Sequence, residues 1–220
     1  MAKDQKDLIA EALLEAWDAG KVCLHPSDTL PGLSFNPTSE KARNFLYDLK
    51  QRPWQKSCIY LAKDLSMVER FANHISPNWL QILDKLWPGP LTVVLSAKDA
   101  NLVPMGQDGS IAVRVPYFDE DRSWMRMVLE RVETIFPSTS VNISGEKSMT
   151  SWKEAINFAE KYEQLYIPSI KKIPNFAANP STIIRLGKDK DFELLRQGVL
   201  TSEQIVSAGA ILKTEVISET

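Results

Sequence analysis

Short apolar runs typical of strands alternate irregularly with amphipathic segments typical of helices, and this irregular order constrains the fold most. Two strand-like runs, 91–97 and 111–116, have no helix-sized pattern between them. A purely parallel, doubly wound sheet would place a helix there, so the sequence predicts an α/β (α+β-like) protein with a mixed sheet flanked by helices. The other strand-like runs are 22–24, 57–62, 138–143, 181–186 and 192–196, and the last two are expected to form a hairpin.

Capping residues and prolines mark the expected helix boundaries. Thr38 is expected to cap a helix that ends before Pro53, because proline disfavours helical geometry in the residue before it. Ser151 and Glu154 have the spacing of a capping box, which satisfies free N–H groups at a helix start. Further helices are predicted at 3–19, from 76 to 86, at 120–133 and from 201 to about 209.

Length and composition indicate one ordinary globular domain. The 220 residues contain no internal repeat and no clear linker, so a single domain over 1–210 with a polar tail at 211–220 is expected. The net charge of −2 argues against general affinity for nucleic acid. No stretch approaches the roughly 20 apolar residues of a membrane span, so no membrane contact and a cytoplasmic location are expected. Cys23 and Cys58 lie in apolar runs and are expected to be small buried hydrophobes.

Several well-known catalytic and cofactor motifs are missing from the sequence. It has no G-x-x-x-x-G-K-[ST] phosphate loop, no G-x-G-x-x-G fingerprint and no G-x-S-x-G elbow. The two histidines, His25 and His74, are not part of a cluster with metal-ligand spacing, so no protein-bound metal is expected. Any chemistry must therefore lie elsewhere.

Two polar loops could bind a charged ligand. Residues 26–29, with the sequence P-S-D-T, follow a strand end, and they suit either a small polar ligand or a turn capped by its own side chains. Lys50, Arg52 and Lys56 cluster around a helix C-terminus. They could clamp a polyphosphate, or they could simply interact favourably with the helix dipole.

Two strand ends are also candidates. Arg114 lies in an apolar strand before a proline, where its burial requires a partner, either a ligand carboxylate or an internal aspartate. Residues 138–145 carry hydroxyls and an amide at a strand end, which could orient a ligand or form an ordinary polar edge.

Taken together, these segments resemble the YrdC family of L-threonylcarbamoyladenylate synthases. The resemblance spans about residues 22–200, and its specificity comes from the order and spacing of short motifs. The motifs are P-S-D-T at 26–29, L-K-Q-R-P at 49–53, W-P-G-P-L-T at 87–92, A-V-R-V-P at 112–116, S-V-N-I-S-G at 140–145, S-T-I-I at 181–184 and L-L-R-Q-G at 194–198.

The resemblance implies a YrdC-like fold, a twisted open sheet with a positive cavity where strand ends meet. It also implies a reaction in which threonine and bicarbonate form a carbamate that attacks the α-phosphorus of ATP and releases pyrophosphate. The ligands would be ATP, L-threonine and bicarbonate, with Mg²⁺ carried by the ATP phosphates. The product would serve tRNA threonylcarbamoyladenosine modification through downstream threonylcarbamoyl transferase proteins, and tRNA or double-stranded RNA could be a further partner.

The resemblance also implies roles for single residues. Lys50 and Arg52 would be catalytic and, with Lys56, would hold the ATP phosphates. Thr29, Arg114 and Ser138 would bind threonine, with Arg114 pairing with its carboxylate. The nucleotide site would be completed by Ser140, Asn142, Ser148, Ser181 and Arg196. Asp28 would bind the substrate or stabilise its own loop.

The sequence departs from the family pattern after the P-S-D-T motif. Members usually have an aromatic residue followed directly by glycine, whereas Leu30 and Pro31 precede Gly32 here. One alternative is therefore a diverged paralogue that binds a nucleotide or double-stranded RNA, with the steep salt dependence of phosphate contacts. Two further alternatives are a maturation domain acting on carbamoyl phosphate, usually part of a longer chain, and a ribulose-phosphate-type enzyme, whose acidic metal site has no match in the sequence.

Overall fold

The computed structural model describes residues 4–51, 58–98, 108–134, 136–177 and 179–213. In this part of the chain the strands form one mixed sheet in the order β10-β9-β8-β4-β5-β3-β6-β2-β1-β7. The strands are β1 (Val22–His25), β2 (Gly32–Ser34), β3 (Ile59–Leu61), β4 (Leu91–Ser96), β5 (Ser110–Arg114), β6 (Phe136–Ser140), β7 (Leu165–Tyr166), β8 (Thr182–Leu186), β9 (Asp191–Arg196) and β10 (Ile211–Leu212).

The pairing confirms the mixed sheet. Strands β4 and β5, which have no helix between them, pair antiparallel, whereas β3 pairs parallel with β5 and β4 pairs parallel with β8. Strands β8 and β9 form the predicted hairpin, with a register shift near Ile183. The prediction of an α/β (α+β-like) fold with a mixed sheet is therefore confirmed.

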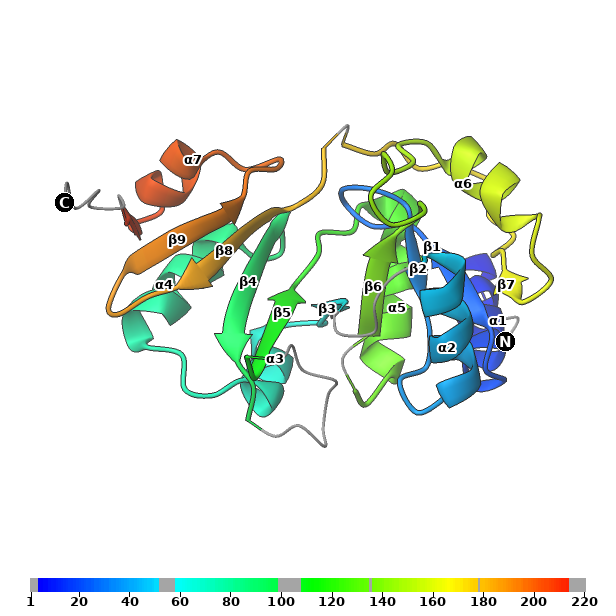
Figure 1. Cartoon of the computed structure of the whole chain (residues 1–220), viewed down its shortest axis with the longest axis horizontal. Helices are drawn as coiled ribbons and strands as arrows, with labels where there is room; N and C mark the ends of the chain where they lie inside the picture. Colours follow the sequence, from blue (N-terminus) through cyan, green and yellow to red (C-terminus); the bar gives the residue numbers. More distant parts are fainter. Residues whose placement is uncertain (1–3, 52–57, 99–107, 135, 178, 214–220) are drawn as a thin grey trace.

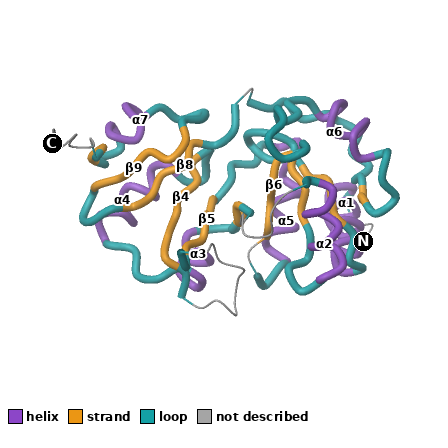
Figure 2. Tube along the Cα trace, in the orientation of Figure 1, coloured by secondary structure: helices purple, strands orange, loops and turns teal. Residues whose placement is uncertain are grey.

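Helices pack on the two halves of this long sheet (Figures 1 and 2). Around one half lie α1, α2, α5 and α6, and around the other lie α3, α4 and α7. The helices are α1 (Gln5–Asp18), α2 (Glu40–Leu49), α3 (Leu65–Phe71), α4 (Pro77–Leu86), the 3-10 helix η1 (Glu120–Arg122), α5 (Ser123–Arg131), α6 (Trp152–Ala159) and α7 (Ser202–Ser207).

Three hydrophobic clusters hold these elements to the sheet. Trp79 of α4 is 1% exposed and belongs to the cluster under β4 and β5, while Trp152 of α6, also 1% exposed, packs near β1. Trp17 of α1 stacks on Phe136 of β6 at a ring-centroid distance of 5.6 Å in the third cluster. The middle of the sheet, between these packed halves, is where polar residues collect.

Several local predictions need correction. Ser39, not Thr38, caps α2, because its side chain accepts from the Ala42 N–H, whereas the Thr38 hydroxyl donates to Asn36. Strand β6 covers 136–140 rather than 138–143. Ile211 and Leu212, at the start of the predicted tail, pair with β9 as β10.

The predictions on helix caps and cysteine burial are confirmed. The capping box of Ser151 and Glu154 is present at the start of α6, and Ser76 caps α4 with Pro77 in its first turn. Cys23 and Cys58 are both buried, and burial raises the pKa of Cys23 to about 12. Across the described residues, no helix combines the length and apolarity needed to cross a membrane.

Candidate active site

A cavity of about 400 Å³ lies across the middle of the sheet. Its wall takes residues from β9, β8, β4, β5, β3, β6 and β2, seven strands that are neighbours in the sheet order, and from the loop before β2. The wall combines apolar side chains, such as Ile183 and Leu195, with hydroxyls and two guanidinium groups. This size and mixture suit a small polar ligand with an apolar part.

The loop between β1 and β2 is held by the hydroxyl of Ser27. Ser27 Oγ accepts hydrogen bonds from the backbone N–H groups of Thr29 and Leu30, both at 3.2 Å, and donates to the Leu30 carbonyl at 2.7 Å. This is the local side-chain-to-backbone bonding by which serine stabilises turns. The capped turn and the ligand-facing loop, which the sequence left open as alternatives, are therefore compatible, because Ser27 forms the turn and Thr29 lines the cavity.

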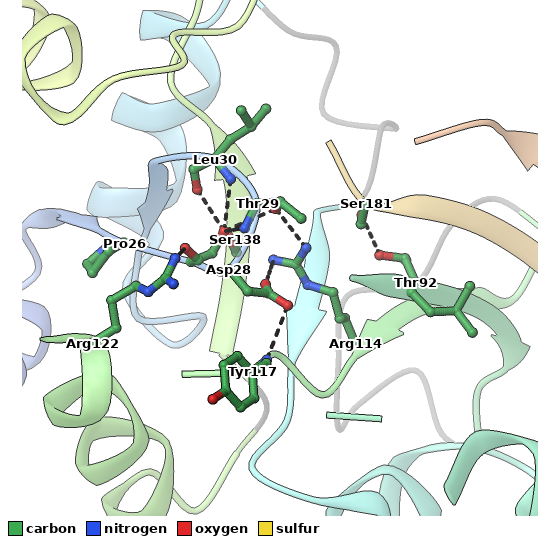
Figure 3. Close-up of polar contacts among 12 residues, drawn as sticks. Pro26, Asp28, Thr29, Leu30, Thr92, Arg114, Tyr117, Arg122, Ser138 and Ser181 are labelled. Carbon is green, nitrogen blue, oxygen red and sulfur yellow. Dashed lines mark hydrogen bonds and ion pairs between the residues drawn. The ribbon is translucent and has the colours of Figure 1, made fainter. Parts of the chain in front are cut away.

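Arg114, at the end of β5, is 4% exposed and lines the cavity. Figure 3 shows its guanidinium between Thr29 and Asp28. Its Nη1 donates to Thr29 Oγ1 at 2.9 Å, and its Nη2 lies 3.4 Å from Asp28 Oδ1. Its Nε–H has no hydrogen-bond partner among the described residues. Both partners considered from sequence thus stay open, because Asp28 neutralises part of the charge while Arg114 also lines the cavity.

Asp28 also fixes the segment that follows β5. Its Oδ2 accepts from the backbone N–H of Tyr117 at 3.1 Å (Figure 3). Arg122 adds a second anchor for the same loop, because its Nη1 donates to the Ser27 carbonyl at 2.8 Å and to the Asn175 carbonyl at 3.1 Å. The side-chain hydrogen bond from Arg122 to Asp119 holds the pKa of Asp119 below its usual range. The loop is therefore held from both sides.

Ser138, on β6, lines the cavity beside these groups and is bonded from behind by His25. Its Oγ lies 3.1 Å from His25 Nε2, and His25 is fully buried. Sequence reasoning noted His25 only as one of two histidines and missed its contact with Ser138. The only sequence signal was its position directly before the P-S-D-T loop, which does not show the contact itself.

Lys50 lies at the C-terminal end of α2 and is 2% exposed. Its Nζ donates to the carbonyl of Ser140 at 2.6 Å, and to the carbonyl and the side-chain oxygen of Asn142 at 3.0 and 2.8 Å. Ser140 donates to the same Asn142 oxygen at 2.8 Å, and Asn142 donates to the Glu146 carbonyl. Lys50 and Asn142 do not form part of the described cavity wall, whereas Ser140 does. This geometry favours an anchoring role for Lys50.

The far wall of the cavity comes from the β8–β9 hairpin. Ser181 is 2% exposed and exchanges a hydrogen bond of 2.8 Å with Thr92 (Figure 3). Arg196 donates through Nη2 to the Ser181 carbonyl at 2.9 Å. Desolvation, and to a lesser extent the positive charge of Arg114, lowers the pKa of the Arg196 guanidinium. Two cations on one cavity favour an anionic ligand.

The predicted site residues therefore fall into three groups. The cavity wall includes Thr29, Arg114, Ser138, Ser140, Ser148, Ser181 and Arg196. Lys50 and Asn142 lie behind the wall at Ser140. Arg52 and Lys56 lie outside the described residues, so the predicted phosphate clamp stays a prediction. Within the described ranges there is no cluster of three or more histidine, cysteine or acidic side chains that could hold a metal ion.

Comparisons with known proteins identify a family and several relatives of this chain. Residues 15–198 match the Sua5/YciO/YrdC family, whose description is telomere recombination. A protein of Methanocaldococcus jannaschii, provisionally named threonylcarbamoyl-AMP synthase, is 30% identical over 203 residues, which is 92% of each chain. The threonylcarbamoyl-AMP synthase of Yersinia enterocolitica is 28% identical over 202 residues, 90% of this chain and all of the relative.

Solved structures agree with these sequence matches. The crystal structure of P. abyssi Sua5 with L-threonine superposes with a TM-score of 0.78 at 26% identity, covering 96% of this chain. The chain spans only 61% of that Sua5 chain. The E. coli YciO structure superposes with a TM-score of 0.73 at 22% identity over 92% of this chain and 95% of YciO, a similarity that concerns the fold alone.

Proposed function

The chain belongs to the Sua5/YciO/YrdC family, and from that premise we propose that it is a threonylcarbamoyl-AMP synthase, an enzyme of the nucleotidyltransferase type. The amine of L-threonine and bicarbonate give a carbamate with loss of water. A carbamate oxygen then attacks the α-phosphorus of ATP, and the bond to the β-phosphate oxygen breaks to release pyrophosphate. The relatives that support this proposal are named as synthases of the same product, threonylcarbamoyl-AMP. These names do not favour the alternative of a non-catalytic RNA-binding paralogue.

The observation that supports the proposal best is the state of Arg114. A guanidinium that is 4% exposed and paired at 3.4 Å with one aspartate oxygen keeps part of its desolvation cost, which a ligand carboxylate in the cavity it lines would offset. A carboxylate matches the planar fork of arginine. Threonine fits this requirement, and the Sua5 relative was crystallised with L-threonine.

The hydroxyls beside Arg114 supply the remaining contacts in this proposal. Thr29 and Ser138 lie on the same cavity wall and would bind the polar atoms around the threonine Cα. Placing the carboxylate on Arg114 fixes one end of the amino acid. The amine, which becomes the carbamate, is then directed along the cavity toward the nucleotide.

The nucleotide would occupy the part of the cavity near the β8–β9 hairpin. Ser140, Ser148, Ser181 and Arg196 line this part, with Ile183 and Leu195 as apolar surface for a base. Lys50 would hold Ser140 and Asn142 in place from behind. Arg52 and Lys56 keep their predicted role at the phosphates. We propose that ATP enters with Mg²⁺ on its phosphate oxygens, because the described cavity wall has no carboxylate to hold the ion.

Catalysis in this arrangement comes from positioning and charge. Phosphoryl and nucleotidyl transfer needs aligned reactants and neutralised phosphate oxygens more than covalent help from the protein. Arg196 and the predicted clamp residues would stabilise charge on the leaving pyrophosphate. The adenylate would be consumed in the cytoplasm by a threonylcarbamoyl transferase that modifies tRNA, and binding of tRNA itself is part of this proposal.

Product identification tests the proposal. The purified protein is incubated with Mg²⁺–ATP, L-threonine and isotopically labelled bicarbonate, and the products are analysed by mass spectrometry. Threonylcarbamoyl-AMP that carries the label, and that disappears when any one substrate is left out, is the expected result. Absence of the adenylate in folded protein that binds ATP would refute the proposal, and a salt-dependent titration with double-stranded RNA would then test the remaining alternative.

A further inference from the structure

His25 closes β1 and lies directly behind the cavity wall, and nothing in the proposed reaction yet uses it. Its side chain is fully buried, with the Phe136 ring edge-on at a centroid distance of 5.3 Å. Its two ring nitrogens each have one polar neighbour: Nδ1 lies 3.1 Å from the carbonyl oxygen of Pro26, and Nε2 lies 3.1 Å from Ser138 Oγ. A buried imidazole with both nitrogens bonded has a defined orientation.

The neighbours of His25 fix where its proton lies. A carbonyl oxygen only accepts hydrogen bonds, so Nδ1 carries the hydrogen that points to Pro26. Burial lowers the pKa of His25 to about 4, which keeps the ring neutral near pH 7. Nε2 of the neutral ring therefore has a lone pair, and the Ser138 hydroxyl must donate to it.

This arrangement decides what Ser138 offers to a ligand. Its single proton points to His25, so Ser138 Oγ has only lone pairs left for the cavity. Thr29 has its own partners on the cavity wall. Its Oγ1 accepts from Arg114 and lies 3.1 Å from Ser27 Oγ, and because Ser27 donates its proton to the Leu30 carbonyl, Thr29 donates to Ser27.

We propose that His25 is a positioning residue that sets the Ser138 hydroxyl as a hydrogen-bond acceptor, so that the site selects an N–H donor of the substrate at that point. The proposal rests on the proposed function, in which that donor is the amine, and later the carbamate N–H, of threonine. Arg114, which Thr29 helps to orient, binds the carboxylate. Ser138 and Arg114 together recognise an α-amino acid by polarity as well as by charge.

The backbone beside this pair leaves no spare room. A Cβ atom at Gly32 would lie 2.6 Å from His25 Nε2 and 3.0 Å from Ser138 Oγ. Any side chain at position 32 would therefore push the imidazole or the hydroxyl away. The close approach of this backbone gives a physical reason for glycine at the start of β2, and it shows that the His25–Ser138 contact is a packed feature.

The first test needs no activity. Nitrogen chemical shifts of the imidazoles report the tautomer, and the chain has two histidines, which His74→Gln assigns. We expect His25 to be neutral with hydrogen on Nδ1 at pH 7, and Ser138→Ala to change the Nε2 shift through loss of its donor. A proton on Nε2, or no response to Ser138→Ala, would overturn the proposal whether or not the protein is a synthase.

The second test is a double-mutant cycle on substrate binding, with wild-type turnover measured first so that a failure of the proposed function is seen separately. His25→Phe keeps the ring volume but cannot accept the hydrogen bond from Ser138. We expect it to raise the KM for L-threonine about tenfold with little change in the KM for ATP. His25→Gln, which offers an acceptor oxygen, should recover part of the loss. In a Ser138→Ala background, His25→Phe should have almost no further effect.

The control is His74→Phe, because His74 is exposed and does not line this cavity. Its KM for L-threonine should match the wild type. If His25→Phe is folded with an unchanged threonine KM, or if its effect adds fully to that of Ser138→Ala, His25 does not act through Ser138. Should His25→Phe fail to fold, His25→Gln and the nitrogen shifts decide the question.

Discussion

Replacing Lys50 by methionine separates an anchoring lysine from one that contacts phosphate. Methionine keeps much of the length of the side chain but removes the ammonium, whose nitrogen lies within 3.0 Å of the Ser140 carbonyl and of both oxygens of Asn142. The backbone bond from the Ser144 N–H to the Lys50 carbonyl, 2.8 Å long, is kept. The substitution therefore tests the side-chain contacts alone.

The magnitude follows from those contacts. A hydrogen bond to a charged group contributes about 1.5–3 kcal/mol net, so three of them set an upper limit of several kcal/mol. Removing the ammonium also removes the cost of keeping a charge 2% exposed, which offsets part of the loss. We expect Lys50→Met to lower the free energy of unfolding by about 3 kcal/mol and to reduce turnover, because Ser140 and Asn142 lose their anchor.

Urea denaturation measures the stability change, and pyrophosphate release measures the activity. Lys85→Met is the matched control, since Lys85 is exposed and its Nζ donates to the Ala208 carbonyl at 3.0 Å. The control should change the free energy of unfolding by less than about 0.5 kcal/mol. If Lys50→Met instead keeps wild-type stability but loses ATP binding, Lys50 acts at the phosphates and the anchoring argument is refuted.

Three further predictions follow from the same geometry. Arg114→Lys should raise the KM for L-threonine at least about tenfold, with the KM for ATP nearly unchanged, because lysine cannot contact Thr29, Asp28 and a carboxylate as one fork. Initial-rate kinetics measure both KM values, and wild-type values for both would contradict this prediction. Gly32→Ala should lower the free energy of unfolding by about 1–3 kcal/mol through its 2.6 Å approach to His25 Nε2, and an unchanged urea midpoint would show that the pair can move at little cost. The pKa of His25 is lowered from 6.5 to about 4 on folding, so its neutral form contributes about 3 kcal/mol of stability that is complete above pH 6.5 and is lost as the pH falls to 4. Between pH 6.5 and pH 4, the free energy of unfolding measured in urea should therefore fall more steeply for wild type than for His25→Phe. Parallel pH dependences of the two proteins would speak against a buried neutral histidine.

The sequence predicted the elements whose signals are local. The capping box at Ser151, the proline at the start of α4 and the apolar runs of β4 and β5 all depend on neighbouring residues, and each was found. The short strands β2, β7 and β10 were missed, because two or three residues show no periodicity and their pairing depends on partners far away in the chain. Helix α3, at seven residues, was missed for the same lack of pattern.

The candidate site was predicted as a set of residue types rather than as a geometry. Thr29, Arg114 and Ser138 do line one cavity, as the motifs implied. Residues near each other in a motif can nevertheless point differently: Ser140 lines the wall, while Asn142, two residues later, bonds Lys50 behind it. The His25–Ser138 contact joins residues 113 positions apart, and no spacing rule in the sequence could indicate it.

The proposed function requires that this cavity join threonine, bicarbonate and ATP. The decisive measurement is pyrophosphate release by the purified protein with Mg²⁺–ATP, with L-threonine and bicarbonate each present or left out in turn. We expect release that requires both threonine and bicarbonate and that falls strongly in Arg114→Lys at low threonine concentration. Release that is independent of threonine, or no release from folded protein that binds ATP, would rule this function out.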